Sequence, residues 1–258
     1  MICAIAGREL RSLFLSPLAW SILAVVQLIF AYMFLAQIDL FIQVQPRLPM
    51  LPGAPGMTEI IAVPLLGNAS MVLLLVVPLI TMRLISDERR NQTLSLLFAA
   101  PISMTSIVVG KYLGVMTFLL LMLLMILMMP LALLLGGTLD FGMLAAASLG
   151  LLLLLASFAA LGLFMSSLTA QPTIAAVSTF GVLLLLWILD WAGNNAGSGS
   201  ASGAGQGNDV LAYLSILRHY EALLKGVFNS ADLIYYLLFI VMFLVLTVRR
   251  LDAERTQH

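Results

Sequence analysis

Residues 83–93 read Arg83-Leu84-Ile85-Ser86-Asp87-Glu88-Arg89-Arg90-Asn91-Gln92-Thr93 and separate two long apolar stretches of the chain. Charged residues make up only 9% of the sequence and hydrophobic residues 62%, so this cluster of charges is unusual. The mean hydropathy of +1.11 excludes an ordinary soluble domain, in which about half of the residues are apolar. The composition predicts an all-α integral membrane protein, and the charged stretch indicates where it meets a soluble partner.

Stretches without Asp, Glu, Lys or Arg locate the predicted membrane spans. Crossing the hydrocarbon core takes about 20 residues of helix, and stretch 141–189 would be about 74 Å long as one helix, so it must fold back. The polar break at residues 166–172 is the expected turn. Residues 1–258 are therefore predicted to form a single domain of six transmembrane helices, at about 18–38, 60–84, 107–135, 142–167, 172–191 and 232–249.

The distribution of basic residues predicts the orientation. Cytoplasmic loops carry an excess of Lys and Arg, and an even number of spans places both termini on one side. With both termini in the cytoplasm, the inner side holds nine basic residues and the outer side three. The inner group is Arg8, Arg11, Arg83, Arg89, Arg90, Lys111, Arg249, Arg250 and Arg255, and the outer group is Arg47, Arg218 and Lys225. We expect a multi-pass protein of the cell (inner) membrane.

The segments outside the spans also show patterns. Residues 1–16 are predicted to form an interfacial helix, with Ile5, Leu10, Leu13 and Phe14 on one flank and Arg8, Glu9 and Arg11 among its polar residues. An unstructured leader is the alternative. The Gly- and Ser-rich segment 193–208 is predicted to be a flexible outer linker, and residues 210–228 a short amphipathic helix.

Small residues recur at helical spacing in the fourth span. Ala156 with Ala160, and Gly162 with Ser166, lie four positions apart, and such pairs let helix backbones approach closely in a membrane. We interpret these four as helix-packing residues. Pro78 and Pro130, inside the second and third spans, are expected to kink their helices because each removes a backbone hydrogen bond.

No catalytic or nucleotide-binding motif is present. The sequence holds only two histidines, and Val109-Gly110-Lys111-Tyr112 lacks the upstream Gly and the following Ser or Thr of a phosphate-binding loop. No predicted span has a charge at its centre, which disfavours an ion-coupled transporter. Lys111, at a span end, is expected to take an interfacial or snorkelling position. We expect no catalytic residue, metal or cofactor in this chain and no nucleic-acid partner. An intramembrane enzyme is the disfavoured alternative.

The charged stretch predicts a short helix between the second and third spans. Ser86 is expected to cap it, with Asp87 and Glu88 in its first turn and Arg89 and Arg90 following. Leu94, Leu97 and Phe98 recur at i, i+3 and i+4, and Pro101 would end the helix. Such a helix could push on the spans at both its ends, or it could simply rest on the lipid surface.

These residues resemble a known family. Residues 78–103, followed by Val108-Val109-Gly110-Lys111, resemble the signature of ABC-2-type permeases of the gliding-motility type. The opening, with Arg8-Glu9-Leu10, Phe14 and Ser16-Pro17-Leu18-Ala19, is similar, as are Leu214-Ser215, His219-Tyr220 and Lys225-Gly226-Val227. Gln92 departs from the pattern, because the family usually has Gly before the Thr.

The resemblance implies the transmembrane subunit of an ATP-driven exporter. Its partners would be a cytoplasmic ABC ATPase dimer that holds the ATP and Mg, a second permease subunit, the same chain or a related one, and an accessory membrane protein with an extracytoplasmic domain. Residues 86–101 would form the coupling helix that contacts the ATPase, through Asp87, Glu88, Arg89, Arg90, Leu94, Leu97, Phe98 and Pro101. The alternative function is a mechanical complex that moves no solute and transmits force to the accessory protein through the outer segments.

Overall fold

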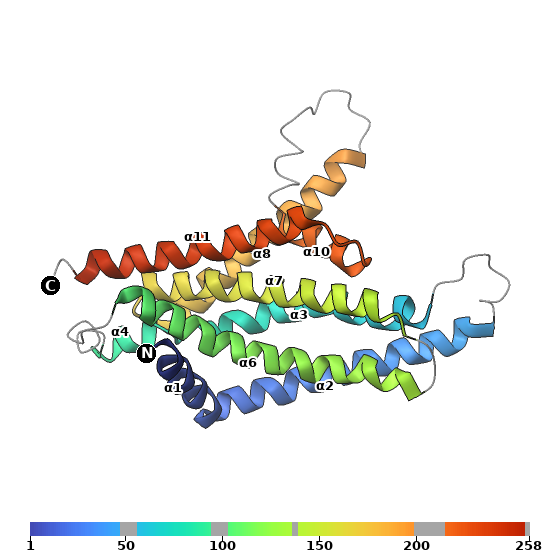
Figure 1. The fold of residues 1–258 in the computed structure, drawn as a ribbon, viewed down its shortest axis with the longest axis horizontal. Helices are drawn as coiled ribbons and strands as arrows, with labels where there is room; N and C mark the ends of the chain where they lie inside the picture. Colours follow the sequence, from blue (N-terminus) through green and yellow to red (C-terminus); the bar gives the residue numbers. More distant parts are fainter. Residues whose placement is uncertain (47–55, 94–102, 136–138, 199–214, 256–258) are drawn as a thin grey trace.

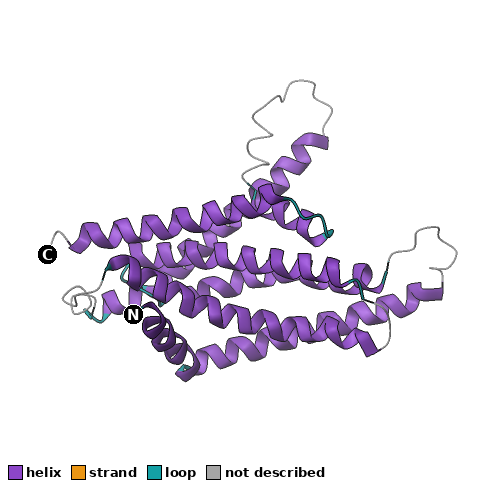
Figure 2. Cartoon of the chain, viewed as in Figure 1, coloured by secondary structure: helices purple, strands orange, loops and turns teal. Residues whose placement is uncertain are grey.

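The structure, a computed structural model, describes residues 1–46, 56–93, 103–135, 139–198 and 215–255, and within these ranges the regular elements are all helices (Figure 2). A short π-helical segment, η2 (Thr58–Ala62), leads into α3, and a short 3-10 segment, η3 (Leu133–Leu135), follows α6. The helices are α1 (Ile2–Leu15), α2 (Pro17–Val44), α3 (Val63–Thr81), α4 (Ser86–Arg90), α6 (Met104–Ala132), α7 (Phe141–Leu168), α8 (Pro172–Ser198), α10 (Ile216–Leu224) and α11 (Ser230–Arg255).

Five segments of the described chain are long and apolar enough to cross a membrane: 17–44, 58–90, 104–132, 141–168 and 230–255. They coincide with five of the six predicted spans. The sixth prediction, 172–191, falls on α8, whose apolar portion Pro172–Ile188 is shorter. The protein is therefore a multi-pass, all-α membrane protein.

The long helices form an elongated bundle in which both termini lie at one end, together with α4 (Figure 1). We call this the termini end, and the opposite end, where η2 and α10 lie, the far end. At the termini end α1 crosses the bundle obliquely and packs mainly on α6. This position matches the predicted separate helix at residues 1–16.

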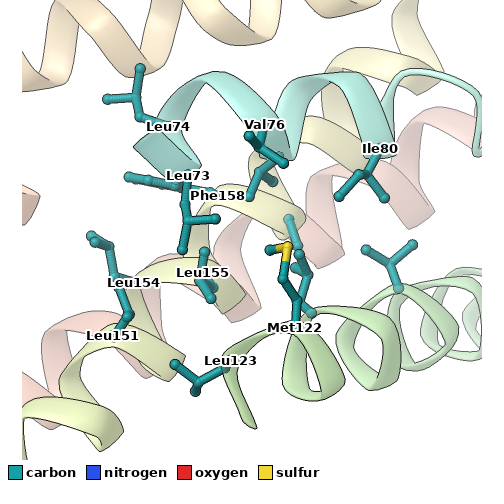
Figure 3. Packing of buried hydrophobic residues seen from close by; sticks show 14 of the residues in the cluster. Leu73, Leu74, Val76, Ile80, Met122, Leu123, Leu151, Leu154, Leu155 and Phe158 are labelled. Carbon is teal, nitrogen blue, oxygen red and sulfur yellow. The ribbon is translucent and has the colours of Figure 1, made fainter. Parts of the chain in front are cut away.

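α7 is the centre of the bundle. It packs against α3, α6, α8, α10 and α11. In its most apolar stretch 72% of the residues are buried, whereas in α2 and in α11 the share is 22%. Figure 3 shows the core where α7 meets α3 and α6, with Leu73, Val76, Met122 and Phe158 among the interdigitating side chains. The outer faces of α2 and α11 remain apolar and unpacked, as expected of surfaces that contact lipid.

Close approach to α7 depends on its small residues. A Cβ on Gly162 would lie 2.7 Å from the Cβ of Thr81 in α3, so only glycine allows this contact. Ala156 and Ala160 are buried in a cluster with Ile240 of α11. These three predicted packing residues thus lie at contacts within the chain.

Two features differ from expectation at element boundaries. α8 continues as a helix to Ser198, six residues into the predicted linker 193–208, a stretch without proline, and the rest of that linker lies outside the described residues. Of the predicted outer helix 210–228, residues 210–214 lie outside the described residues, and the described part is helical over Ile216–Leu224. Ser215 caps this helix, because its Oγ accepts a hydrogen bond from the Arg218 amide. Pro78 and Pro130 lie inside α3 and α6, and the kinks expected there stay predictions.

Candidate functional site

The charged stretch forms only a short helix. α4 spans Ser86–Arg90, and its N-cap is Ile85 rather than the predicted Ser86. The prediction was wrong because Ser86 is fully buried and its hydroxyl donates a hydrogen bond backwards to the Met82 carbonyl. Asp87 and Glu88 do lie in the first turn, where acidic side chains interact favourably with the positive end of the helix dipole.

α4 ends in a left-handed residue. The Thr93 amide donates to the Glu88 carbonyl and the Gln92 amide to the Arg89 carbonyl, with Gln92 at φ 56°; this pair of bonds is a Schellman motif, which usually has glycine at that position. The predicted helix 86–101 is therefore not continuous, since its backbone reverses hand at Gln92. The remaining predicted contact residues, Leu94, Leu97, Phe98 and Pro101, lie outside the described residues.

Lys111 joins α4 to two other elements. Its Nζ lies 2.8 Å from Glu88 Oε1 of α4 and 3.3 Å from Glu9 Oε2 of α1, and donates to the Leu84 carbonyl at 2.7 Å. The side chain is buried rather than snorkelling, with 3% of the residue exposed. The expectation was wrong because α1 and α4 cover this end of α6, and Glu9, Glu88 and the Leu84 carbonyl supply the three oxygens that a buried ammonium requires.

Two glycines bring α1 close enough for this network. A Cβ on Gly110 would lie 2.8 Å from Ile5 Cβ, and one on Gly114 would lie 2.8 Å from Glu9 Cβ. Gly110 and Gly114 are four positions apart on α6, the spacing that permits close helix crossing. This pair was not predicted, although its four-residue spacing is visible in the sequence.

α1 presents the predicted faces. Ile5, Leu10, Leu13 and Phe14 pack against the core, whereas Arg8 and Arg11 are exposed. Glu9 is the polar residue of α1 that turns inward, toward Lys111. α1 is thus anchored both by its apolar flank and by one ion pair.

A second ion pair joins α4 to the end of the chain. Arg89 Nη2 lies 2.6 Å from both carboxylate oxygens of Glu254 in α11, and Arg250 Nη2 lies 3.3 Å from Glu254 Oε1. In contrast, Arg90 is exposed and has no ion pair with any described residue. Of the four charged residues in α4, Glu88 and Arg89 therefore form ion pairs within the chain, and Arg90 faces outward.

Ser166 at the end of α7 fixes the turn before α4. Its hydroxyl accepts hydrogen bonds from the amides of Ile85 and Ser86, both at 3.1 Å, and donates to the Met82 carbonyl at 3.0 Å. These amides are among the groups that a helix start leaves without intrahelical partners. A residue predicted only as a small packing residue thus caps α4 from another helix.

Two cavities flank α4. One, of about 310 Å³, lies between α1, α2, α3 and α4 and includes Glu9, Glu88 and Lys111 in its wall. The other, of about 800 Å³, is more open and lies between α4 and the start of α8, next to Arg89, Arg90 and Pro172. α4 is accordingly surrounded by space on two sides and held by ion pairs.

At the far end, buried polar side chains fasten α10. His219 Nδ1 lies 2.6 Å from Asp232 Oδ1 of α11; Tyr220 donates to the Leu66 carbonyl of α3 and Tyr236 to the Ile216 carbonyl, both at 2.7 Å. Burial raises the pKa of Tyr220 well above its usual range, so its hydroxyl stays a donor. Within the described residues, no group of His, Cys, Asp and Glu side chains could hold a metal ion.

Comparison with known proteins identifies the family. A family described as "ABC-2 family transporter protein" matches residues 3–255. A search of curated proteins found no match. Membership implies an ATPase partner, since ABC permeases are membrane subunits that work with one. Because the match covers nearly the whole bundle, the chain belongs to the ABC-2 transporter family and is the permease subunit of an ABC transporter.

Proposed function

We propose that this permease is an exporter subunit driven by a cytoplasmic ABC ATPase dimer that docks at α4 and the residues that follow it. The observation that carries the proposal is the position of α4. It lies at the termini end and is linked to α1 and α6 through Lys111 and to α11 through Glu254. A displacement of α4 would therefore act on three helices at once.

The proposed orientation places the termini end in the cytoplasm. Both termini lie at the same end of the bundle (Figure 1), which supports an even number of membrane crossings. Five described helices have spanning length, so an even number makes α8 the sixth span. The excess of Lys and Arg toward the termini end supports a cytoplasmic location in the inner membrane.

The pairs within the chain narrow the ATPase contact. Glu88 and Arg89 are occupied by Lys111 and Glu254, which leaves Arg90 as the exposed charge of α4. We therefore propose Arg90 as the contact of α4 itself, together with the predicted residues Leu97 and Phe98 beyond it. ATP and Mg would be held by the ATPase.

The test is copurification of the permease with its ATPase. Arg90→Glu, Leu97→Asp and Phe98→Asp should each lose the ATPase, or stimulated ATP turnover, while membrane insertion is unchanged. Arg255→Glu, a charge reversal at another exposed arginine of the termini end, is the matched control and should copurify normally. Unchanged association in all three test variants would overturn the proposal.

The alternative, force transmission to an extracytoplasmic accessory protein without solute transport, is also supported by an observation. α11 is tied to α4 at one end through Glu254 and to α10 at the other through Asp232, so it connects the two ends of the molecule. A gliding-motility type complex would use this connection. Vesicle assays separate the two functions, because this alternative requires ATP turnover without cargo movement.

A further inference from the structure

The cavity at the termini end lies next to an apolar groove on the outside of the bundle. The cavity of about 310 Å³ lies between α1, α2, α3 and α4, and the groove, of about 470 Å³, runs between α2 and α3. Ile22 and Leu79 line both the cavity and the groove. The charged residues line only the cavity. A small-molecule site typically has a volume of about 300–1,000 Å³, so either compartment can hold part of a ligand.

The groove has the dimensions of one acyl chain in one leaflet. On α2 its wall runs from Ser21 to Ile29, and on α3 from Leu79 to Met71. Eight residues of helix rise about 12 Å, close to the roughly 15 Å that is half of the hydrocarbon core. The lining is aliphatic except for Ser21, whose hydroxyl donates to the Leu18 carbonyl of its own helix.

The cavity walls carry unpaired groups of both signs. Arg8 and Arg83 line it, and neither forms an ion pair with a described residue. Asp87 is likewise without an ion pair to the described chain, and Glu88 Oε2 is a buried acceptor to which no described group donates. Lys111 cannot satisfy Oε2, since its ammonium is already occupied by Glu88 Oε1, Glu9 and Leu84.

We propose that this compound site binds a phospholipid with a primary ammonium headgroup, of the phosphatidylethanolamine type, from the leaflet at the termini end. The phosphate lies between Arg8 and Arg83, the ammonium donates to Asp87, and one acyl chain fills the groove between α2 and α3. Arginine suits a phosphate because its guanidinium donates several hydrogen bonds, and the negative charges of Asp87 and Glu88 attract the ammonium. The proposal does not depend on ATPase docking, because it concerns the isolated permease.

Headgroup selectivity tests the site. The permease is extracted from vesicles that contain equal amounts of phosphatidylethanolamine, phosphatidylcholine and phosphatidylglycerol, and the lipid retained on it is measured by native mass spectrometry. Phosphatidylethanolamine should be enriched, because the choline ammonium has no hydrogen to donate and phosphatidylglycerol has no cation. Equal retention of the three lipids, or preference for either of the others, would mean ordinary annular lipid and would overturn the proposal.

Matched variants locate the bound lipid. Arg8→Gln and Arg83→Gln should each lower the retained phosphatidylethanolamine about five-fold, the effect of losing one partly solvated charge contact. Arg11→Gln removes a similar exposed arginine from α1 outside the cavity wall and should have no effect. In the groove, Val25→Trp should displace the lipid, whereas Leu28→Trp, on the same helix but outside the groove wall, should not. If test and control variants retain the lipid equally, the site is not where we place it.

Discussion

At the residue scale, the ammonium of Lys111 is held by three oxygens at the termini end. Almost complete burial removes it from water, and three oxygens from α1, α4 and the turn at Leu84 replace the lost hydration. Such a group is costly to disturb, because removing one partner of a buried ion pair leaves the other charge without compensation. Lys111 therefore holds α1, α4 and α6 in one arrangement.

Replacing Lys111 by Met should lower the free energy of unfolding by about 3 kcal/mol, because Glu9 and Glu88 keep their charges without the ammonium. Thermal unfolding of the purified protein in detergent measures the effect. The double variant Lys111→Met/Glu88→Gln should recover part of the loss, since it removes one of the two carboxylates. Lys225→Met, at an exposed lysine of the far end, is the control, and a loss of the same size there would contradict the role of the network.

Gln92 is the one non-glycine residue with a left-handed backbone in the described chain, and it ends α4. An L residue in this region costs about 1 kcal/mol more than glycine does. This cost is the physical reason why glycine is the usual residue where a Schellman motif ends a helix. Gln92 adopts the conformation because the Schellman bonds from Thr93 and from its own amide stabilise it.

Substitutions at Gln92 should follow backbone preference. Gln92→Val should lower the melting temperature, because a β-branched residue is disfavoured at positive φ. Gln92→Gly should leave the melting temperature unchanged or raise it, because the free energy of unfolding rises by up to about 1 kcal/mol. Calorimetry of both variants beside the unmodified protein checks the order, and a valine variant as stable as the glycine variant would show that the turn is not formed.

At the element scale, the crossing of α1 over α6 sets the position of Glu9. The absence of side chains at Gly110 and Gly114 lets the two backbones approach, and the Lys111 ion pair forms between them. The same principle operates where Gly162 of α7 meets Thr81 of α3. Helix positions in this bundle thus depend on small residues at particular crossings.

Gly110→Ala should separate α1 from α6. Its Cβ would lie 2.8 Å from Ile5 Cβ, and relief of such overpacking costs about 1–3 kcal/mol. Trypsin should then cut faster after Arg8 and Arg11, which limited proteolysis would show. Gly181→Ala in α8 meets no atom within 4 Å and should leave the digestion rate unchanged; faster cleavage in both variants would indicate a general rather than a local effect.

At the scale of the whole molecule, the helices place both termini and α4 together and α10 at the opposite end (Figure 1). Central α7 joins these ends, because it packs on α3, α6, α8, α10 and α11. The less buried helices α2 and α11 lie at the periphery. This arrangement gives the proposed ATPase and any extracytoplasmic partner separate surfaces.

The single cysteine makes the orientation measurable. Cys3 is exposed at the termini end, so a membrane-impermeant maleimide should label it in inverted vesicles and not in intact cells. In a Cys3→Ser background, Ala170→Cys should behave like Cys3, whereas Val227→Cys should be labelled from outside, because the proposed sixth span, α8, lies between them in the chain. Labelling of positions 170 and 227 from the same side would exclude six spans.

The sequence by itself determined the membrane class and the positions of five long helices, because runs of about 20 uncharged residues have few other stable structures. It also located the charged stretch and the amphipathic pattern of α1. Local signals of this kind depend on neighbouring residues, so they can be read without a fold. The boundaries of α4 were harder to predict from the sequence. Ser86 could either cap a helix or be buried, and only the packing of the folded chain decides between these two positions.

Tertiary structure alone decided the partners of Lys111, Arg89 and Ser166. Their partners are Glu9, Glu254 and the backbone amide of Ile85, and each lies far from its partner along the chain. A sequence shows the charge of a residue but not which residues cover it. The pattern at Lys111 was compatible with snorkelling to the interface. The crossing of α1 over two glycines of α6 made burial possible, and a buried ammonium is stable only where the fold brings its oxygens together.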